Sequence, residues 1–194
     1  MSRLTYIDEG ENPFKCQLEC DQCDHVTLNG LRCQRRVCIG VPTCWQHTKT
    51  KYGVKSAIST IVGAGKGLFA TRNFNRWEWI CPYIGENITD ACLTARFGNG
   101  TAPYATDSVG GAIDSACRRG IASLANGLFT ANGNSRGERF HNARIVYNPD
   151  GEIWVRAIKF IPSGDEIYIF YGKEYRLDGL HSTKRVRAAD SRPC

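Results

Sequence analysis

Apolar and polar residues alternate over short stretches in the last two-thirds of this chain, a pattern typical of half-buried β-strands. The clearest case is a pair of apolar runs, residues 143–147 and 152–157, separated by Asn148-Pro149-Asp150-Gly151. Proline fixes φ and glycine accepts a positive φ, so this spacer predicts a tight turn and the two runs a hairpin. By the same pattern, further strands are expected at residues 57–62, 67–71, 78–84 and 166–171.

Helical periodicity is sparse. Residues 89–97 predict one short helix that begins near Thr89 or Asp90. Residues 98–111 and 131–138 are rich in glycine, asparagine, serine and threonine, and we expect them to be loops. The chain is therefore expected to be mainly β, built of small sheets.

The first quarter of the chain has a different composition. Residues 16–47 hold six of the ten cysteines and few residues that could build a hydrophobic core. Residues 48–55 resemble a short basic linker. We expect four parts: a flexible lead-in at 1–15, a cysteine/histidine module at 16–50, a main domain at 55–176 and a basic tail at 177–194.

The crowded cysteines predict a structural zinc site, because so short and polar a segment needs a cross-link, such as a bound metal ion, to fold. Zinc prefers four sulfur or nitrogen ligands arranged as a tetrahedron. Gly30 supplies a reversal that returns Cys33 toward Cys23, and the spacing Cys-x2-His lets Cys44 and His47 reach one ion from a single turn. The predicted ligands are Cys23, Cys33, Cys44 and His47. The alternatives, or members of a second site, are Cys16, Cys20, His25 and Cys38.

Charge and hydropathy narrow the class of protein. The formal net charge is +6 and the sequence pI is about 8.8, which permits a weak nucleic-acid contact without demanding one. Arg32, Arg35 and Arg36 could form such a contact or be a solvated face. The start of the chain has no apolar signal-like segment, and no apolar run approaches the length of a membrane span, so we expect an intracellular protein with no membrane contact.

A glycine-rich stretch, Gly63-Ala64-Gly65-Lys66-Gly67, follows the first expected strand. Glycine lets the backbone approach a ligand closely. The stretch is not a phosphate-binding P-loop, because the run before Lys66 is too short and Gly67 follows it in place of serine or threonine. It is also a poor dinucleotide fingerprint, since GxGxxG is not completed. A plain tight turn between two strands is the remaining alternative.

Three stretches together resemble the SET-domain family of protein lysine methyltransferases over residues 55–176. They are Gly65-Lys66-Gly67-Leu68-Phe69-Ala70, Tyr83-Ile84-Gly85-Glu86, and Gly164-Asp165-Glu166-Ile167 continuing to Tyr171-Gly172. Ile113-Asp114 and His141-Asn142-Ala143 also fit the family's pattern. The resemblance implies small curved sheets, a C-terminal pseudoknot and the cofactor S-adenosylmethionine.

The resemblance also implies functions for single residues. Gly65, Lys66, Gly67 and Asn126 would hold the cofactor, and Glu166 would be a structural acid. Tyr171 would be catalytic, orienting the substrate amine and also touching the cofactor. Tyr83, Tyr104 and Ile169 would line the lysine channel, where Ile169 replaces the family's usual Phe or Tyr. The implied partner is a protein substrate, with histone tails expected.

One motif departs from the family. The chain has Ala122-Ser123-Leu124-Ala125-Asn126-Gly127, with Gly127 where members usually carry a histidine that helps to grip the cofactor. A non-catalytic SET-like binding module, tethered to chromatin or nucleic acid by the zinc segment, is therefore an alternative. A zinc-dependent nucleic-acid binder with an unrelated β domain is a third.

The cysteine segment also resembles short modules of large DNA viruses, through Cys23, Thr27, Gly30, Arg32-Cys33 and Cys44-Trp45-Gln46-His47. This resemblance makes a viral origin and a location in the host nucleus or virion expectations. The oligomeric state is left open by the sequence.

Overall fold

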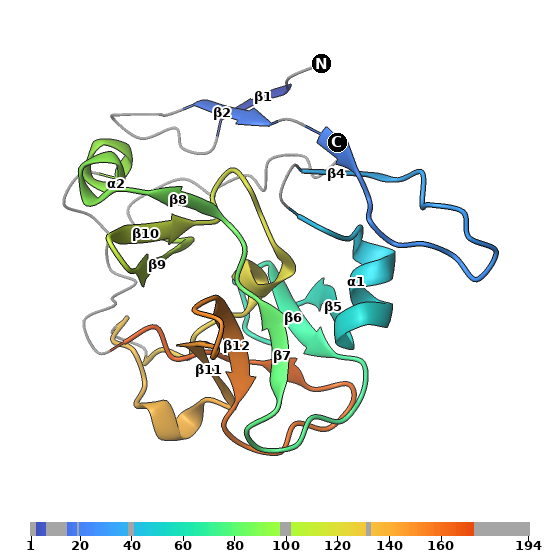
Figure 1. Ribbon diagram of the computed structural model, residues 1–194. Helices are drawn as coiled ribbons and strands as arrows, with labels where there is room; N and C mark the ends of the chain where they lie inside the picture. The colour runs from blue at the N-terminus through green and yellow to red at the C-terminus, as the bar shows by residue number, and fades with distance from the viewer. Residues whose placement is uncertain are drawn as a thin grey trace. The chain divides into compact units, whose positions relative to one another are not determined.

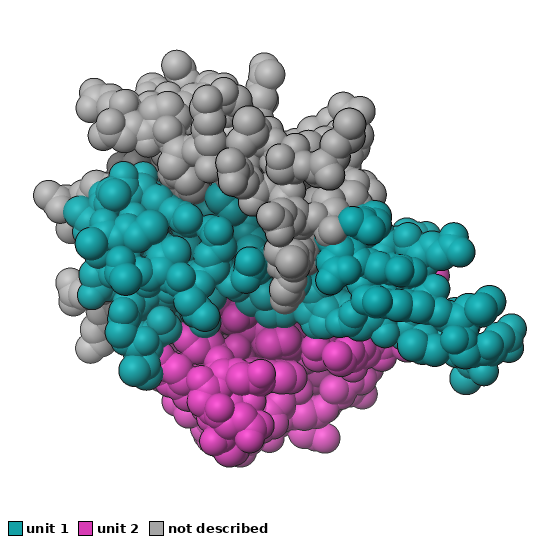
Figure 2. Space-filling view, turned by 45° about the horizontal axis from the view of Figure 1, so that its top comes forward, with its two compact units in different colours: residues 1–44, 84–120, 181–194 teal, residues 45–83, 121–180 magenta. Residues whose placement is uncertain are grey.

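The structure, a computed structural model, describes residues 3–6, 15–18, 20–38, 41–97, 102–130 and 133–172 (Figure 1). The predicted basic tail at 177–194 lies outside these residues. The chain divides into two compact units, one of residues 1–44, 84–120 and 181–194 and one of residues 45–83 and 121–180 (Figure 2). Within the described residues, all sheets are antiparallel with two or three strands, which confirms the mainly-β expectation. No helix of the described residues is long and apolar enough to cross a membrane.

The described residues of the first unit form two small hairpins, one three-stranded sheet and one helix. The hairpins pair β1 (Arg3–Tyr6) with β2 (Lys15–Leu18) and β3 (Cys20–Gln22) with β4 (Arg36–Cys38). The sheet has the order β8 (Glu86–Ile88), β10 (Gly111–Asp114), β9 (Ala105–Ser108), and the helix is α2 (Asp90–Phe97). The predicted helix at 89–97 is thus confirmed. The predicted loop at 98–111 is wrong at β9, whose pairing with β10 no local pattern indicates.

A buried ion pair attaches α2 to this sheet. Arg96 Nη1 lies 2.7 Å from both Glu86 Oε2 and Asp114 Oδ2, and Asp114 is fully buried. Burial opposes the charge on Arg96, but the two carboxylates outweigh it and raise the pKa of Arg96. Removing Arg96 would leave Asp114 buried and uncompensated, so this pair fixes the position of the helix.

In the second unit, the part of the chain that the structure describes forms two three-stranded sheets, the helix α1 (Trp45–Tyr52) and two short 3-10 turns, η1 (Ile121–Leu124) and η2 (Glu138–Phe140). One sheet has the order β13 (Glu166–Ile167), β6 (Lys66–Ala70), β5 (Val54–Ile58). The other has the order β11 (Ala143–Tyr147), β12 (Ile153–Ala157), β7 (Trp79–Pro82). In this sheet β7, which is far from β12 in sequence, lies beside it (Figure 1).

The predicted hairpin is confirmed as β11 and β12. Asn148 Oδ1 accepts hydrogen bonds from the N–H groups of Asp150 and Glu152 at 3.0 and 2.8 Å, and Gly151 has φ +80°. Gly151 therefore has the positive φ that the sequence analysis expected, and Asn148 adds side-chain hydrogen bonds that the sequence analysis did not single out.

The core of the second unit includes residues from both sheets. Leu68, Ile167 and Val155 are fully buried, together with Ile161 and Ile169. Burying each such side chain contributes about 1.5–3 kcal/mol. The alternation of buried and partly buried residues along β12 shows that one face of its sheet packs on this core and the other faces outward.

Several boundaries of secondary-structure elements differ from those expected. Residues 48–55, expected to be a linker, form the end of α1 and the start of β5. The strand expected at 166–171 is regular only as β13. Beyond it, Tyr168 bridges Asn126 and Ile169 bridges Ala143, both in parallel. The C-terminal segment thus lies between two earlier segments, as the expected pseudoknot requires.

Candidate active site and metal centre

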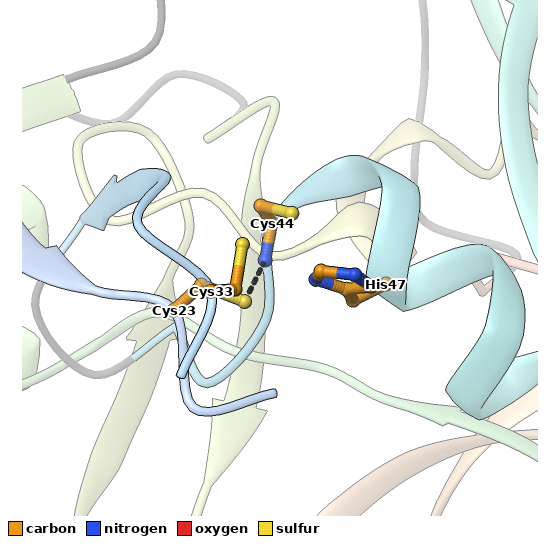
Figure 3. Close-up of side chains that lie close together, drawn as sticks. All are labelled: Cys23, Cys33, Cys44 and His47. Atoms are coloured by element: carbon orange, nitrogen blue, oxygen red, sulfur yellow. Dashed lines mark hydrogen bonds between the residues drawn. The ribbon is translucent and has the colours of Figure 1, made fainter. Parts of the chain in front are cut away.

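The four predicted zinc ligands come together in space. Figure 3 shows the side chains of Cys23, Cys33, Cys44 and His47 close to one another, and their ligand atoms all lie within 4.8 Å of each other. Cys23 and Cys44 are buried. Three thiols and an imidazole at this spacing are a donor set suited to tetrahedral zinc.

Backbone hydrogen bonds build the segment around this cluster. Gly30, at φ +74°, reverses the chain as predicted, and Cys33 N–H then donates to His25 O at 2.8 Å. The Cys44 N–H donates to Cys23 Sγ at 3.1 Å. Burial alone would raise the pKa of the Cys23 thiol, but this bond and others lower it overall, which favours the thiolate that a metal requires. The side chains of the alternative ligands Cys16, Cys20 and Cys38 lie outside what the structure describes.

The second unit contains a buried carboxylate with an unusual number of donors. Glu166, 4% exposed, accepts hydrogen bonds from Ser59 Oγ, Thr60 N and Thr60 Oγ1, each at 2.7 Å. Asn126 Nδ2 and the Tyr168 hydroxyl add bonds at 3.1 Å. Burial would raise the pKa of Glu166, but these donors outweigh it and lower the pKa, so the group is a carboxylate at neutral pH.

Asn126 joins this carboxylate to the glycine-rich turn. Its Nδ2 lies 3.1 Å from each of three acceptors, Ser59 Oγ, Lys66 O and Glu166 Oε1. Residues 62–66 of the turn are exposed, whereas Gly67 is buried against Glu166. The structure therefore brings Lys66, Gly67 and Asn126 together and leaves Gly65 at the exposed tip beside them.

Tyr171 lies against the same segment. Its hydroxyl donates a short hydrogen bond to the carbonyl of Ala125, and its ring stacks on Phe129 with centroids 6.2 Å apart. A Cβ on Gly127 would lie 2.6 Å from Tyr171 Cδ2. The absence of a side chain at 127 is therefore what lets the Tyr171 ring lie where it does.

His141 and Asn142 hold the chain around this centre. Leu128 N–H donates to His141 Nε2 at 3.0 Å, while Nδ1 lies 3.2 Å from the carbonyl of Gly137 and donates to it. Burial lowers the pKa of His141, so the ring is neutral. Asn142 accepts from Tyr168 N at 2.8 Å and donates to Glu166 O at 2.9 Å, which fixes the strand that carries the carboxylate.

The predicted channel residues occupy different surroundings. Tyr83 is buried and its N–H donates to Ile153 O at 2.8 Å. Ile169 is fully buried, with its N–H on Asn126 O at 2.9 Å. Tyr104 belongs to the other unit, where the Arg119 guanidinium stacks 4.0 Å from its ring centroid. Their part in a lysine channel stays a prediction.

Sequence reasoning missed Ser59 and Thr60 and did not single out His141. Ser59 and Thr60 directly follow β5 and supply three of the donors to Glu166. A signal was present, since a glutamate beside the apolar run Ile167–Phe170 must find donors if its strand is buried. The sequence alone does not say where those donors come from.

This architecture, a glycine turn tied through an asparagine to a buried glutamate and a nearby tyrosine, defines a SET-like β protein. The SET domain matches residues 65–172, and the chain belongs to the SET-domain family. No curated protein matched the sequence.

Two solved structures of one complex agree in fold with this chain. The polycomb repressive complex 2 of Chaetomium thermophilum, autoinhibited and bound to S-adenosylmethionine, is 24% identical with TM-score 0.50 over 64% of this chain and 16% of that chain. Another structure of that complex is also 24% identical, with a TM-score of 0.50, and the match covers 63% of this chain and 15% of that chain. The methyltransferase domain of human PR domain-containing protein 2 is 16% identical, with a TM-score of 0.47, and the match covers 66% of this chain and 84% of that chain. The chain thus spans a small part of the first relatives, and the likeness is one of fold.

Proposed function

We propose that this protein is an S-adenosylmethionine-dependent protein lysine N-methyltransferase that acts on histone tails. One observation carries the proposal: the Asn126 side chain links the Lys66 carbonyl of the glycine turn to the Glu166 carboxylate, with Tyr171 bonded to the adjacent Ala125 carbonyl. The family resemblance assigns Lys66 and Asn126 to the cofactor, Tyr171 to the substrate amine and the cofactor, and Glu166 to a structural function. The S-adenosylmethionine-bound fold relative supports the choice of methyl donor.

The residues present fit such a donor. S-adenosylmethionine supplies a methyl group on a positively charged sulfur, so the protein has to position its reactants and keep the amine neutral. The exposed Gly65–Lys66 backbone can approach a ligand closely. Because the Tyr171 proton is directed to Ala125 O, the lone pairs of its hydroxyl can accept an N–H of the lysine amine and orient it.

Titration with S-adenosylhomocysteine followed by a methylation assay tests this function. We expect the zinc-loaded protein to bind the ligand and to methylate histone peptides. Asn126→Ala should lose binding, whereas Tyr171→Phe should retain binding and lose methyl transfer. The protein could bind S-adenosylhomocysteine and methylate other lysine peptides but not histone peptides. That result would reject histone tails as the substrate and leave the methyltransferase activity standing. Unchanged transfer by Tyr171→Phe would reject the function given to Tyr171.

Gly127 favours a second candidate, a non-catalytic SET module. A Cβ there would also lie 2.9 Å from Phe129 Cε2, so the family's histidine has no room while Tyr171 lies against the backbone. This module would keep the fold for binding a protein partner. Absence of S-adenosylhomocysteine binding by folded, metal-loaded protein would select it.

We further propose that the Cys23–Cys33–Cys44–His47 cluster binds structural zinc and that the protein works in a nucleus, where histones are found. Metal analysis of the purified protein by mass spectrometry tests the first point. One zinc per chain, lost in Cys33→Ser but retained in Cys92→Ser, is the expected result. Retention of zinc by Cys33→Ser would reject this ligand set.

A further inference from the structure

The outward face of the second sheet of the second unit gathers tryptophan and arginine side chains. Arg144 on β11, Arg156 on β12 and Trp79 on β7 stand directly opposite one another across three adjacent strands. Val155 and Ala157 on either side of Arg156 are fully buried, as are Ala143 beside Arg144 and Ile80 beside Trp79, so this row lies on the opposite, outward side of the sheet. Arg76 and Trp77 precede β7 and extend the row. We call these five residues the tryptophan–arginine face.

Trp77 has a backbone conformation that its side chain does not favour. It is the third residue of a turn closed by Glu78 N–H on Asn75 O at 3.1 Å, and its φ is +73°. A positive φ at that position of a turn favours glycine, and Trp77 is the one described non-glycine residue that has it. The turn is held to β12 by Trp77 N–H on Ala157 O at 2.9 Å and Arg156 Nε on Trp77 O at 2.8 Å.

The protein core does not explain the choice of tryptophan, because Trp77 remains 42% exposed. A bulky residue in a strained conformation on the surface suggests a use for the exposed ring. Glycine would relieve the strain but would provide no ring.

Three positive charges surround this ring. The guanidinium carbons of Arg76, Arg144 and Arg156 lie 4.4, 5.5 and 5.6 Å from the Trp77 centroid, and that of Arg156 lies 4.6 Å from the Trp79 centroid. Among the described residues, the one carboxylate paired with these arginines is Glu138, whose Oε1 is 3.9 Å from Arg144 Nη1. Among the described residues, Arg144 Nε is buried and has no hydrogen-bond partner.

Like charges held this close repel one another, and a polyanion would relieve that repulsion. Exposed aromatic rings beside arginines are also what unpaired bases and backbone phosphates recognise together. A duplex keeps its bases stacked away from such a ring, and an acidic peptide offers charge without bases. We propose that the tryptophan–arginine face binds single-stranded nucleic acid, with guanidinium groups on phosphates and Trp77 stacked on a base.

The proposal does not depend on methyl transfer, and fluorescence anisotropy tests it directly. The probes are fluorescein-labelled oligothymidylate and oligouridylate of roughly 16 nucleotides, with a duplex of the same length. We expect both single strands to bind more tightly than the duplex. Trp77→Gly should weaken binding on the order of tenfold without lowering the urea midpoint of unfolding, because the strain is removed with the ring.

Salt dependence separates stacking from charge. Arg76→Gln should reduce the slope of log K against log salt by about 0.7, the value for one phosphate contact on a single strand. Trp77→Gly should leave that slope unchanged. Lys55→Gln removes an exposed charge from β5, away from the face, and serves as the matched control with unchanged affinity.

Three results would overturn the proposal. They are no binding of single strands at low salt, duplex binding equal to single-strand binding with no loss in Trp77→Gly, or wild-type affinity in both Trp77→Gly and Arg76→Gln. If the Arg35→Gln/Arg36→Gln variant alone lost binding, the nucleic-acid contact would belong to the cysteine segment instead.

Discussion

At the scale of single residues, Gly67 leaves the least room in the candidate site. A Cβ built there would lie 2.1 Å from Glu166 Oε1, and the carboxylate is held by its donors and cannot move away. We expect Gly67→Ala to destabilise the protein by about 1–3 kcal/mol, as overpacking does. Urea unfolding measures this change.

Gly137 provides the matched control for that substitution. A Cβ at Gly137 meets nothing within 4 Å, so Gly137→Ala should stay within about 0.5 kcal/mol of the wild type. Equal stabilities of the two variants would show that Glu166 is not fixed as the hydrogen bonds indicate.

His141 makes stability depend on pH. Its folded-state pKa lies below the ordinary 6.5, so protonation on unfolding is favoured as pH falls. The contribution is fully present above about pH 6.5 and is lost as pH falls through the folded-state pKa. We expect the free energy of unfolding to fall from pH 7 toward pH 5, less steeply in His141→Asn than in the wild type. Parallel curves for wild type and His141→Asn would contradict this assignment.

At the scale of elements, α1 begins directly after Cys44 and carries His47 in its first turn. A helix of eight residues is too short to be stable alone, so its order depends on what it contacts. We expect chelation to speed hydrogen exchange in α1 and in residues 20–38, with β11 and β12 of the second sheet little affected. Hydrogen-exchange mass spectrometry with and without chelator measures this, and uniform exchange across all these segments would contradict it.

Local signals explain which elements could be predicted. Asn148–Gly151 specifies its hairpin, and Thr89 accepts the Cys92 N–H at 3.2 Å at the start of α2, so both follow from residues close in sequence. The short length of β13 could not be predicted, because Tyr168 leaves the sheet to bridge Asn126. Long-range pairing overrode the local pattern there.

The residues of the candidate site also fall into those that the sequence could predict and those that it could not. Glycines, a tyrosine and an asparagine have motif signatures, and the Cys-x2-His spacing marks a turn, so these residues could be named from sequence. Ser59, Thr60 and His141 could not, because serine, threonine and histidine gain their function here from hydrogen bonds to residues 107, 106 and 13 positions away.

At the scale of the whole molecule, the net charge of +6 bears differently on the two proposed ligands. S-adenosylhomocysteine carries no net charge at neutral pH, whereas each phosphate contact with a nucleic acid releases counterions. Raising salt from about 50 to 200 mM should therefore weaken oligonucleotide binding strongly and leave S-adenosylhomocysteine binding nearly unchanged.

The two ligands should also be separable by substitution. Trp77 contacts β12 on the outward side of its sheet, whereas Asn126 contacts Lys66 and Glu166, so neither residue touches the other's partners. We expect Asn126→Ala to lose S-adenosylhomocysteine and keep oligonucleotide affinity, and Trp77→Gly to do the reverse; calorimetry and anisotropy on the same preparations measure both. Because distant sites without shared partners act additively, the double variant should lose both activities by the amounts of the single variants. If Asn126→Ala, folded and metal-loaded, lost oligonucleotide binding as well, the nucleic acid would bind at the glycine turn, and the tryptophan–arginine face would be only a covering of the sheet.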